Sequence, residues 1–161
     1  MQTNAGRRRV KPGISVYRAL GEQLDQAFSI VQEYYAAACV VVREERGEFQ
    51  EQYFGDGAGV WLAAEQGRVV GCIALRKLHG HPGCGEIKRL YVQPVHRGHG
   101  IAEQLLSALE SYAKEFNYRY LFLDTTDEMI AAQRFYERCG YQRCTRYNDN
   151  PQATIFMRKA L

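Results

Sequence analysis

Apolar residues recur along the chain with two periods, one typical of helices and one typical of strands. A spacing of three to four residues predicts helices over residues 23–39, 101–116 and 128–138, and a weaker, more polar helix over 44–52. Short alternating or continuous apolar runs predict strands over residues 14–19, 60–64, 69–75, 86–92, 118–124, 141–147 and 154–159. The expected order is β-α-α-β-β-β-α-β-α-β-β, which indicates an α/β fold with a mixed sheet and helices on its faces.

Turn and stop signals agree with these boundaries. The segment Glu65-Gln-Gly67-Arg is typical of a hairpin turn, Pro94 ends a strand, and Gly140 is typical of the residue that follows a helix. No internal repeat and no Pro/Ser-rich linker divides the 161 residues. We therefore expect one domain over residues 13–161, preceded by a basic, disordered tail over residues 1–12.

The positive net charge belongs to that tail. Lys and Arg total 21 against 18 Asp and Glu, a formal charge of +3. Four basic residues, Arg7, Arg8, Arg9 and Lys11, lie in the first eleven positions, which hold no acidic residue, so the remainder has 17 basic against 18 acidic residues. A nucleic-acid-binding protein that uses the tail is one alternative, but no base-reading motif is visible. We expect no nucleic acid and no membrane among the partners.

The apolar and cysteine content indicates a cytoplasmic protein. The longest uninterrupted apolar stretch has nine residues, 34–42, where a membrane-spanning helix needs about 20. The basic start lacks the apolar segment of a secretory signal, and five cysteines without a C-x-x-C pair favour reduced thiols. The densest group of possible metal ligands, His79, His81 and Cys84, needs a further ligand from elsewhere, so we expect a polar loop there and no metal.

A glycine-rich loop separates the strand over 86–92 from the helix that begins near residue 101. It reads Gln93-Pro-Val-His96-Arg97-Gly98-His99-Gly100-Ile101-Ala102. Free backbone N–H groups in a first helical turn and the positive end of the helix dipole attract anions, and glycine has no Cβ to hold a phosphate away. The loop therefore predicts a phosphate site, with a plain Gly-rich turn as the alternative.

Spacing separates three kinds of nucleotide-binding loop. The Walker loop needs Gly-Lys-Ser/Thr, which is absent. The Rossmann fingerprint needs a small residue where this chain has Glu103, and a tighter turn after the strand. Residues 97–102 match the third pattern, R/Q-x-x-G-x-G/A, at every specified position. With this loop, the strand Glu86-Ile-Lys-Arg-Leu-Tyr-Val92 and the segments over 121–125 and 131–141, the chain resembles the GCN5-related N-acetyltransferase (GNAT) superfamily. The closing segment over 147–157 resembles a subgroup of small bacterial acetyltransferases.

The resemblance implies a mixed, mostly antiparallel sheet flanked by helices, and acetyl-CoA as co-substrate. In such enzymes main-chain N–H groups of the matching loop wrap the pyrophosphate, and the backbone at the end of the preceding strand hydrogen-bonds the pantetheine arm. The implied cofactor contacts are Tyr91, Val92, Arg97, Gly98, His99, Gly100, Ile101, Ala102, Thr125, Ala132 and Tyr136. Met129 stands where many relatives have asparagine, so either a side-chain contact to the pantetheine arm is missing and binding is weaker there, or Thr125 or Thr126 supplies the contact. Capping of the next helix is the alternative interpretation of these threonines.

The resemblance also implies roles in proton transfer for two residues. An acceptor amine with a pKa of about 10.4 is neutral in only about one molecule in a few thousand at pH 7. Glu86 begins its strand where several GNAT enzymes carry a base, so it is expected to accept a proton directly or through water; an ordinary ion pair with Lys88 or Arg89 is the alternative. Tyr136 matches the tyrosine that the family commonly uses to protonate or hydrogen-bond the leaving sulfur, with a core aromatic residue as the alternative.

The expected activity is transfer of an acetyl group from acetyl-CoA to a primary amine of a small molecule or peptide, by direct attack in a ternary complex. The alternative is a non-catalytic acyl-CoA-binding or regulatory module. A homodimer is a further option, because dimers are common in such families. No motif identifies the acceptor. Six residues are candidates for its pocket, although core or turn positions are the favoured interpretation of each: Tyr34, Tyr35, Phe54, Trp61, Tyr147 and Asn150.

Overall fold

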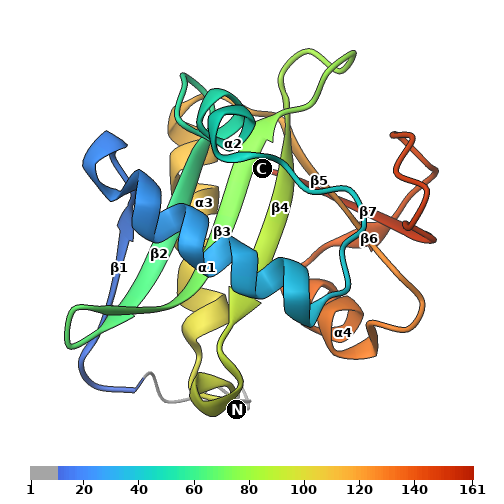
Figure 1. Cartoon of the computed structure of the whole chain (residues 1–161). Coiled ribbons are helices and arrows are strands. Elements are labelled where there is room, and N and C mark those ends of the chain that lie inside the picture. The colour runs from blue at the N-terminus through green and yellow to red at the C-terminus, as the bar shows by residue number, and fades with distance from the viewer. Residues whose placement is uncertain (1–10) are drawn as a thin grey trace, which may run out of the picture.

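The computed structural model describes residues 11–161, and Figure 1 shows their arrangement. The helices are α1 (Leu24–Ala37), α2 (Arg46–Tyr53), α3 (Ile101–Glu115) and α4 (Ile130–Arg138), with short 3₁₀ turns at Gly21–Gln23 and Pro94–His96. The strands are β1 (Ile14–Arg18), β2 (Gly59–Glu65), β3 (Arg68–Lys77), β4 (Cys84–Val92), β5 (Tyr120–Thr125), β6 (Gln142–Arg143) and β7 (Ile155–Ala160). The expected order of elements is confirmed.

The strands form one seven-stranded sheet in the order β1-β2-β3-β4-β5-β7-β6. Within the described residues β4 and β5 are parallel, and the other neighbouring strands are antiparallel. This confirms the expected mixed, mostly antiparallel sheet.

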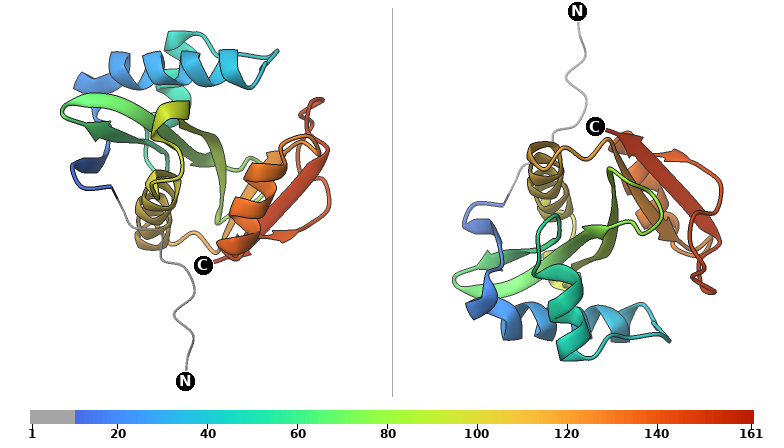
Figure 2. Two further views of the ribbon diagram at one scale, coloured as in Figure 1. Left: turned by 90° about the horizontal axis from the view of Figure 1, so that it is seen from below. Right: turned by 90° about the horizontal axis from the view of Figure 1, so that it is seen from above.

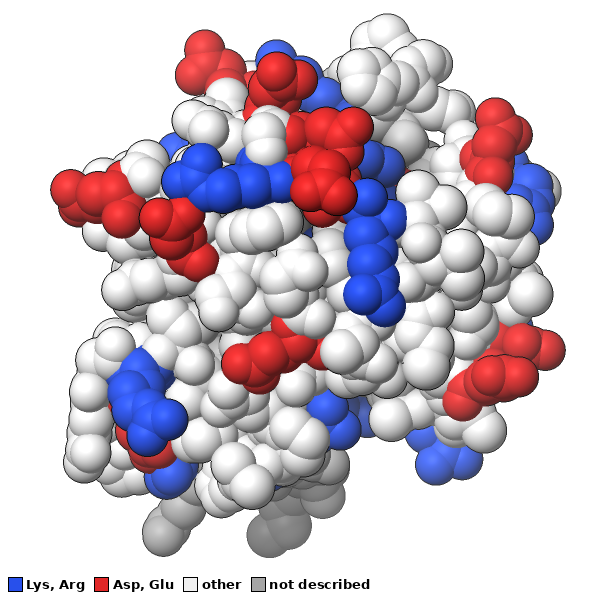
Figure 3. Space-filling model, in the orientation of Figure 1, with Lys and Arg blue, Asp and Glu red and all other residues white. Residues whose placement is uncertain are grey.

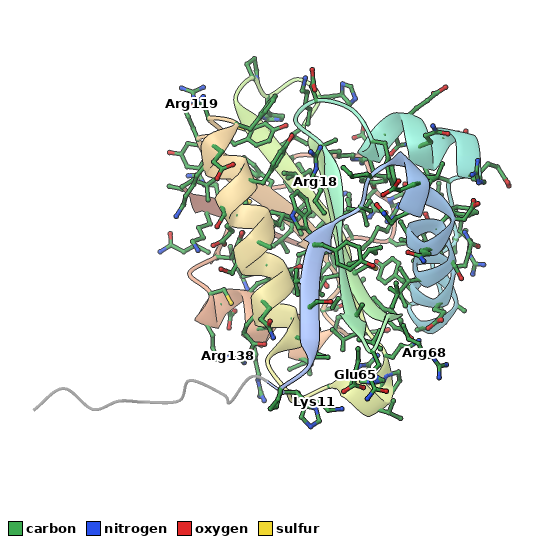
Figure 4. All side chains as sticks on the ribbon, turned by 90° about the vertical axis from the view of Figure 1, so that its left-hand side faces the viewer. Lys11, Arg18, Glu65, Arg68, Arg119 and Arg138 are labelled. Atoms are coloured by element: carbon green, nitrogen blue, oxygen red, sulfur yellow. The ribbon has the colours of Figure 1, made fainter. Side chains whose placement is uncertain are left out.

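Helices cover both faces of the sheet because its strands alternate two sets of apolar side chains. On β2, Trp61 and Ala63 belong to the core beneath α3 and α4, whereas Val60 and Leu62 belong to the core beneath α1 and α2. Figures 2 and 4 show α1 and α2 on one side of the sheet and α3 on the other. β4 is the central strand of the sheet, and its residues are buried or half-buried along its whole length.

The parallel strands β4 and β5 separate soon after they begin. Their pairing covers only residues 84–86 of β4 and 120–122 of β5. The register between β3 and β4 shifts between the pairs Cys72–Tyr91 and Ala74–Lys88, and Arg89 has a positive φ of 58° at this bulge. A bulge increases local bending and twist, so the second half of β4 has an edge that β5 does not cover.

One predicted strand is shorter than expected. Apolar residues over 141–147 predict a strand, but β6 covers only Gln142 and Arg143. The following loop curls around Arg146, whose guanidinium donates to the carbonyls of Asn148, Asn150 and Ala153 at 2.9–3.4 Å. These bonds hold residues 146–153 as a closed loop instead of an extended strand.

The predicted tail lies almost entirely outside the described residues. Lys11 is described, and its Nζ lies 2.6 Å from Glu65 Oε1 at the end of β2 (Figure 4). Among residues 11–161 no helix is long and apolar enough to cross a membrane. The same residues contain no group of three His, Cys, Asp or Glu side chains placed to hold a metal.

Candidate active site

The loop between β4 and α3 has the backbone that a phosphate site requires. Gly98 and Gly100 have φ values of 80° and 74°, a region that side chains with a Cβ rarely adopt. Helix α3 begins directly after Gly100, and the N–H groups of its first turn have no partner within the helix. An ideal Cβ placed on Gly98 would meet no atom within 4 Å, so open space adjoins the loop. The residues present therefore fit a pyrophosphate held by backbone N–H groups.

Arg97 closes this loop onto the end of β4. Its Nε donates to the carbonyl of Val92 at 2.8 Å, and its guanidinium lies 5.9 Å from the ring centre of Tyr91. The N–H of Gln93 donates to Val70 on β3 at 2.9 Å, so the pleat turns the N–H of Val92 away from β3, toward the uncovered edge. Tyr91, Val92 and Arg97 thus lie together, with the Arg97 side chain shaping the loop.

A cavity of about 660 Å³ opens where β4 and β5 separate. Its walls come from the end of α1, the segment before α2, α2 itself, β3, β4, β5, α4 and the β6–β7 loop. Three residues implied as cofactor contacts line it, namely Thr125, Ala132 and Tyr136, whereas the glycine loop lies at the end of β4. The predicted contacts therefore form two groups along the open part of β4.

Tyr136 is 5% exposed and lines the cavity from α4. Its ring packs edge-on against Phe135 and Tyr141, with ring centres 5.1 and 5.3 Å apart. Burial raises the pKa of the Tyr136 hydroxyl above its ordinary value. The group is therefore a neutral phenol at physiological pH and retains a proton that it can donate.

Glu86 is only 2% exposed and lies behind the cavity wall. Arg76 Nε lies 2.9 Å from its Oε2, and Lys88 Nζ, Tyr147 Oη and Asn148 Nδ2 lie 2.8–3.1 Å from its Oε1. Burial favours the neutral acid, but Lys88 and Arg76 outweigh that effect and hold the pKa of Glu86 below its usual range. Glu86 is therefore an ionised carboxylate. It does not line the cavity itself, but its partners Arg76, Lys88 and Asn148 do.

Asp124 is the carboxylate that faces the cavity from the end of β5. Its Oδ2 accepts from Lys88 at 2.9 Å, Asn148 at 2.6 Å and Asn150 at 3.2 Å. Burial opposes ionisation here as well, but Lys88 and the two amides hold the pKa of Asp124 below its usual range. Lys88 and Asn148 join Glu86 and Asp124 into one network.

A second ion pair stands on the other side of the cavity. Arg89 at the β4 bulge donates to Glu44 at 2.5 Å. Glu44 also accepts from the hydroxyls of Tyr35 and Tyr53, and the guanidinium lies 5.8 Å from the ring centre of Tyr34. Figure 3 shows acidic and basic side chains side by side on this face of the molecule, without a large patch of one sign.

Some of these charged residues carry no motif in the sequence, and they come together only in the fold. Arg76 and Glu44 lie in segments outside the matching motifs. Arg89 lies within the matching strand, but it binds Glu44, whereas the partners of Glu86 are Lys88 and Arg76. The alternation Glu86-Ile-Lys88 on a strand was the available signal, since alternate residues share one face. Of the six candidate pocket residues, Tyr34 and Asn150 line the cavity and Tyr147 binds Glu86, whereas Tyr35 and Trp61 are core residues and Phe54 packs against the core.

Solved structures share this fold over nearly the whole chain. An acetyltransferase of the GNAT family from Staphylococcus aureus Mu50 superposes with a TM-score of 0.78 at 19% identity, covering 91% of this chain and 98% of that one. A proposed acyl-CoA N-acyltransferase from Klebsiella pneumoniae has a TM-score of 0.69 at 26% identity, covering 92% and 97%. The fold is therefore that of GNAT acyltransferases.

The family model described as "Acetyltransferase (GNAT) family" matches residues 24–141, and the chain belongs to this family. An uncharacterised N-acetyltransferase of Schizosaccharomyces pombe is 35% identical over 108 residues, which are 65% of this chain and 66% of that protein. The human N-acetylaspartate synthetase is 35% identical over 94 residues, 57% of this chain and 31% of that protein. The matched region thus spans less than two thirds of either relative. The expected GNAT membership is confirmed.

Proposed function

We propose that this chain is an N-acetyltransferase that uses acetyl-CoA and acetylates a primary amine by direct attack within a ternary complex. One observation carries the proposal: the glycine loop and the Tyr136 cavity lie on the same uncovered stretch of β4. A phosphate group at the loop and a reacting group beside Tyr136 would then belong to one extended ligand. Acetyl-CoA has this extended form and supplies an activated thioester.

Binding at the loop rests on the main chain. The N–H groups of Gly98, Gly100, Ile101 and Ala102 face a diphosphate without a side chain in the way, and the dipole of α3 adds to the attraction. The open side of β4 near Val92 offers strand-like hydrogen bonds to an amide-containing arm. His99 holds the loop's shape, since its ring lies 3.3 Å from the carbonyl of His96 and its own carbonyl accepts from Lys11.

Alignment of the amine and removal of its proton fall to the charged network. Well-oriented reactants can gain about 7–11 kcal/mol from alignment alone. Asp124 attracts an ammonium group into the cavity. Glu86 keeps the Asp124 carboxylate in place through Lys88 and Asn148, which bind both acids. Glu86 also accepts a proton, through water or through its partners. Both groups are ionised at neutral pH, as a base must be.

Tyr136 serves the departing thiolate. A buried neutral phenol in the cavity donates a hydrogen bond or a proton to sulfur as the thioester bond breaks. In water, a phenol with a pKa near 10 gives its proton to a thiolate of pKa near 8.5 at a cost of about 2 kcal/mol. Burial destabilises both the thiolate and the phenolate, and it raises the pKa of Tyr136, so a hydrogen bond to the developing thiolate is the main contribution of this hydroxyl.

Acceptor chemistry is the finer part of the proposal. The name of the N-acetylaspartate synthetases points to an amino-acid amine in those relatives, and here the cavity wall carries both signs of charge, from Arg76 and Arg89 to Asp124 and Glu44. A small polar amine, including an amino acid, suits such a wall better than an aliphatic amine does. Dimerisation remains a prediction.

The test is an acceptor screen with thiol detection. Purified protein is incubated with acetyl-CoA and amino acids, polyamines, aminoglycosides or peptides, and free CoA is measured. Release that depends on one acceptor, together with the acetylated product by mass spectrometry, supports the enzyme. Calorimetric binding of acetyl-CoA without release on any acceptor supports the non-catalytic module instead. Absence of binding contradicts both functions.

A further inference from the structure

One glutamine joins two segments that both line the cavity. The bridging residues Val41 and Gln152 are exposed, so the bridge lies at the outer side, the mouth of the cavity. The first segment connects α1 to α2 over residues 38–45, and the second is the β6–β7 loop over residues 144–154. The N–H of Val41 donates to Gln152 Oε1 at 3.0 Å, and Gln152 Nε2 donates to the carbonyl of Cys39 at 3.4 Å. The Gln152 side chain thus binds backbone groups of residues that lie more than one hundred positions away in the sequence.

The β6–β7 side of this bridge is anchored to the candidate active site. The N–H of Gln152 donates to Asn150 Oδ1 at 3.1 Å, and Asn150 Nδ2 donates to Asp124 at 3.2 Å. Arg146 also holds this loop, because its guanidinium donates to the backbone carbonyls of Asn150 and Ala153. Gln152 therefore extends from a loop whose position is fixed by the network around Asp124.

The α1–α2 side is anchored as well. Arg43 Nε donates to the carbonyl of Val40 at 2.7 Å, and its Nη2 donates to the carbonyl of Tyr35 at 3.4 Å. Glu44, two residues after Val42, is bound to Arg89. The bridge through Gln152 thus connects two segments that each have their own attachment to the body.

Both segments line the same cavity. Ala38, Val40 and Val42 contribute from one side, and Pro151, Gln152 and Ala153 contribute from the other, while Leu123, Asp124 and Tyr136 also line it. In Figure 1 the segment that leaves α1 passes in front of the sheet toward α2, and in both views of Figure 2 it lies on the same side as the β6–β7 loop. A polypeptide lying across the cavity would need a continuous groove between these segments, and the Gln152 bridge crosses that path.

We propose that Gln152 is a specificity-determining residue, which closes the mouth so that the acceptor is a small free amine and not a lysine within a polypeptide. This inference rests on the proposed acetyltransferase function. The cavity of about 660 Å³ supports it, because this volume must hold the end of the acyl donor together with the acceptor and lies within the range of small-molecule sites.

The experiment compares two acceptor classes in three variants. The probes are the small amine that performs best in the acceptor screen and a thirteen-residue peptide with one internal lysine and an acetylated N-terminus. Gln152→Ala removes both bridging hydrogen bonds. Gln152→Glu keeps an acceptor for Val41 N–H but loses the donor to Cys39. Gln142→Ala is the matched control, since Gln142 is an exposed glutamine on β6 outside the residues that line the cavity.

Thiol release gives kcat/KM for each acceptor, and hydrogen exchange at the Val41 amide reports the bridge itself. The wild type should prefer the small amine, and Gln152→Ala should shift the ratio toward the peptide by about tenfold or less, because only two exposed hydrogen bonds are lost. Val41 should exchange faster in this variant, Gln152→Glu should lie between, and Gln142→Ala should match the wild type.

Three results would overturn the inference while leaving the acetyltransferase function intact. They are equal use of the peptide by the wild type, an unchanged ratio in Gln152→Ala despite faster exchange at Val41, and unchanged exchange at Val41. Failure to release thiol with every acceptor would instead overturn the proposed function, and the acceptor inference with it.

Discussion

The two ends of the open stretch of β4 differ in how they are built. At the glycine loop, six consecutive residues and the start of one helix carry the groups proposed to bind the donor, and most of these groups are uncharged peptide N–H. Around Asp124, charged side chains from distant segments hold one another in place, with Lys88 Nζ within 2.9 Å of both Glu86 and Asp124.

Under the proposed function, this difference follows from what each end has to recognise. A diphosphate is the same in every molecule of the donor, so a local backbone shape is sufficient. An amine acceptor must be oriented and deprotonated, which needs charges whose pKa values the surroundings control. Substitutions should therefore affect binding of the donor at one end, and rate, pH dependence or stability at the other.

The largest expected effect is loss of donor binding in Gly100→Glu. The φ of 74° disfavours a side chain, and a carboxylate at the helix start repels a diphosphate. We expect acetyl-CoA affinity to fall by at least about a hundredfold, measured by calorimetry. Gly80→Glu is the control, because Gly80 has a φ of 77° in the β3–β4 loop. Unchanged affinity in Gly100→Glu would place the phosphates elsewhere.

Tyr136→Phe should reduce turnover by about 10- to 100-fold, the scale of a lost proton donor, with little change in KM for acetyl-CoA. Since burial raises the pKa of Tyr136, its proton remains in place and the wild-type rate should not decline as pH approaches about 10. Tyr141→Phe is the neighbouring control, whose hydroxyl binds Glu110 at 2.9 Å. Full turnover in Tyr136→Phe would show a purely structural tyrosine.

Glu86→Gln should destabilise the fold, because Lys88 and Arg76 would lose the carboxylate between them. Removing one partner of a buried ion pair costs about 3 kcal/mol or more, and urea unfolding at neutral pH measures it. The rate should also fall if Glu86 passes the amine proton onward. A variant with wild-type stability and wild-type pH–rate profile would contradict both roles.

The pH dependence of stability gives a smaller, graded test of the same network. The folded-state pKa values of Glu86 and Asp124 lie below their unfolded values of about 4. Their stabilisation is therefore complete above that pH and is lost as pH falls through the lowered values. Acid titration of unfolding should show this loss in the wild type and less of it in Glu86→Gln. If the wild type and Glu86→Gln lost stability equally at low pH, Glu86 would not contribute to the pH dependence of stability.

The smallest expected effect belongs to Arg97→Ala. Its guanidinium binds the carbonyl of Val92 at 2.8 Å and is exposed, so the loop loses one tether and not its N–H groups. The affinity for acetyl-CoA should fall by about tenfold or less. A loss as large as that of Gly100→Glu would mean that the arginine itself, not the peptide groups, holds the phosphates.

The sequence was informative wherever a feature is local. The order of strands and helices, the glycine loop and the tyrosine on α4 are all carried by short segments with a clear period or spacing. The sequence predicts a strand that extends to residue 147, whereas the structure has a loop from residue 144. Apolar alternation does not indicate that the Arg146 guanidinium will bind three backbone carbonyls of this loop.

The charged part of the site could not be predicted in the same way. Arg89 meets Glu44 across 45 residues, and Asn148 meets Glu86 across 62. No single-sequence pattern encodes such pairs, since they depend on the β4 bulge and on how the β6–β7 loop closes. Only Glu86 and Lys88, two residues apart on one strand, had a spacing that pointed to a shared face.

The contact at Lys11 has a practical consequence for where the chain can be shortened. Lys11 binds Glu65, Glu65 also lies 3.0 Å from His96, and the N–H of Lys11 donates to the carbonyl of His99. The first described residue is thus bound to the outer side of the glycine loop. For protein engineering, a trimmed version should start no later than Lys11. A start at Gly13 would remove the contacts that Lys11 makes with Glu65 and with the carbonyl of His99.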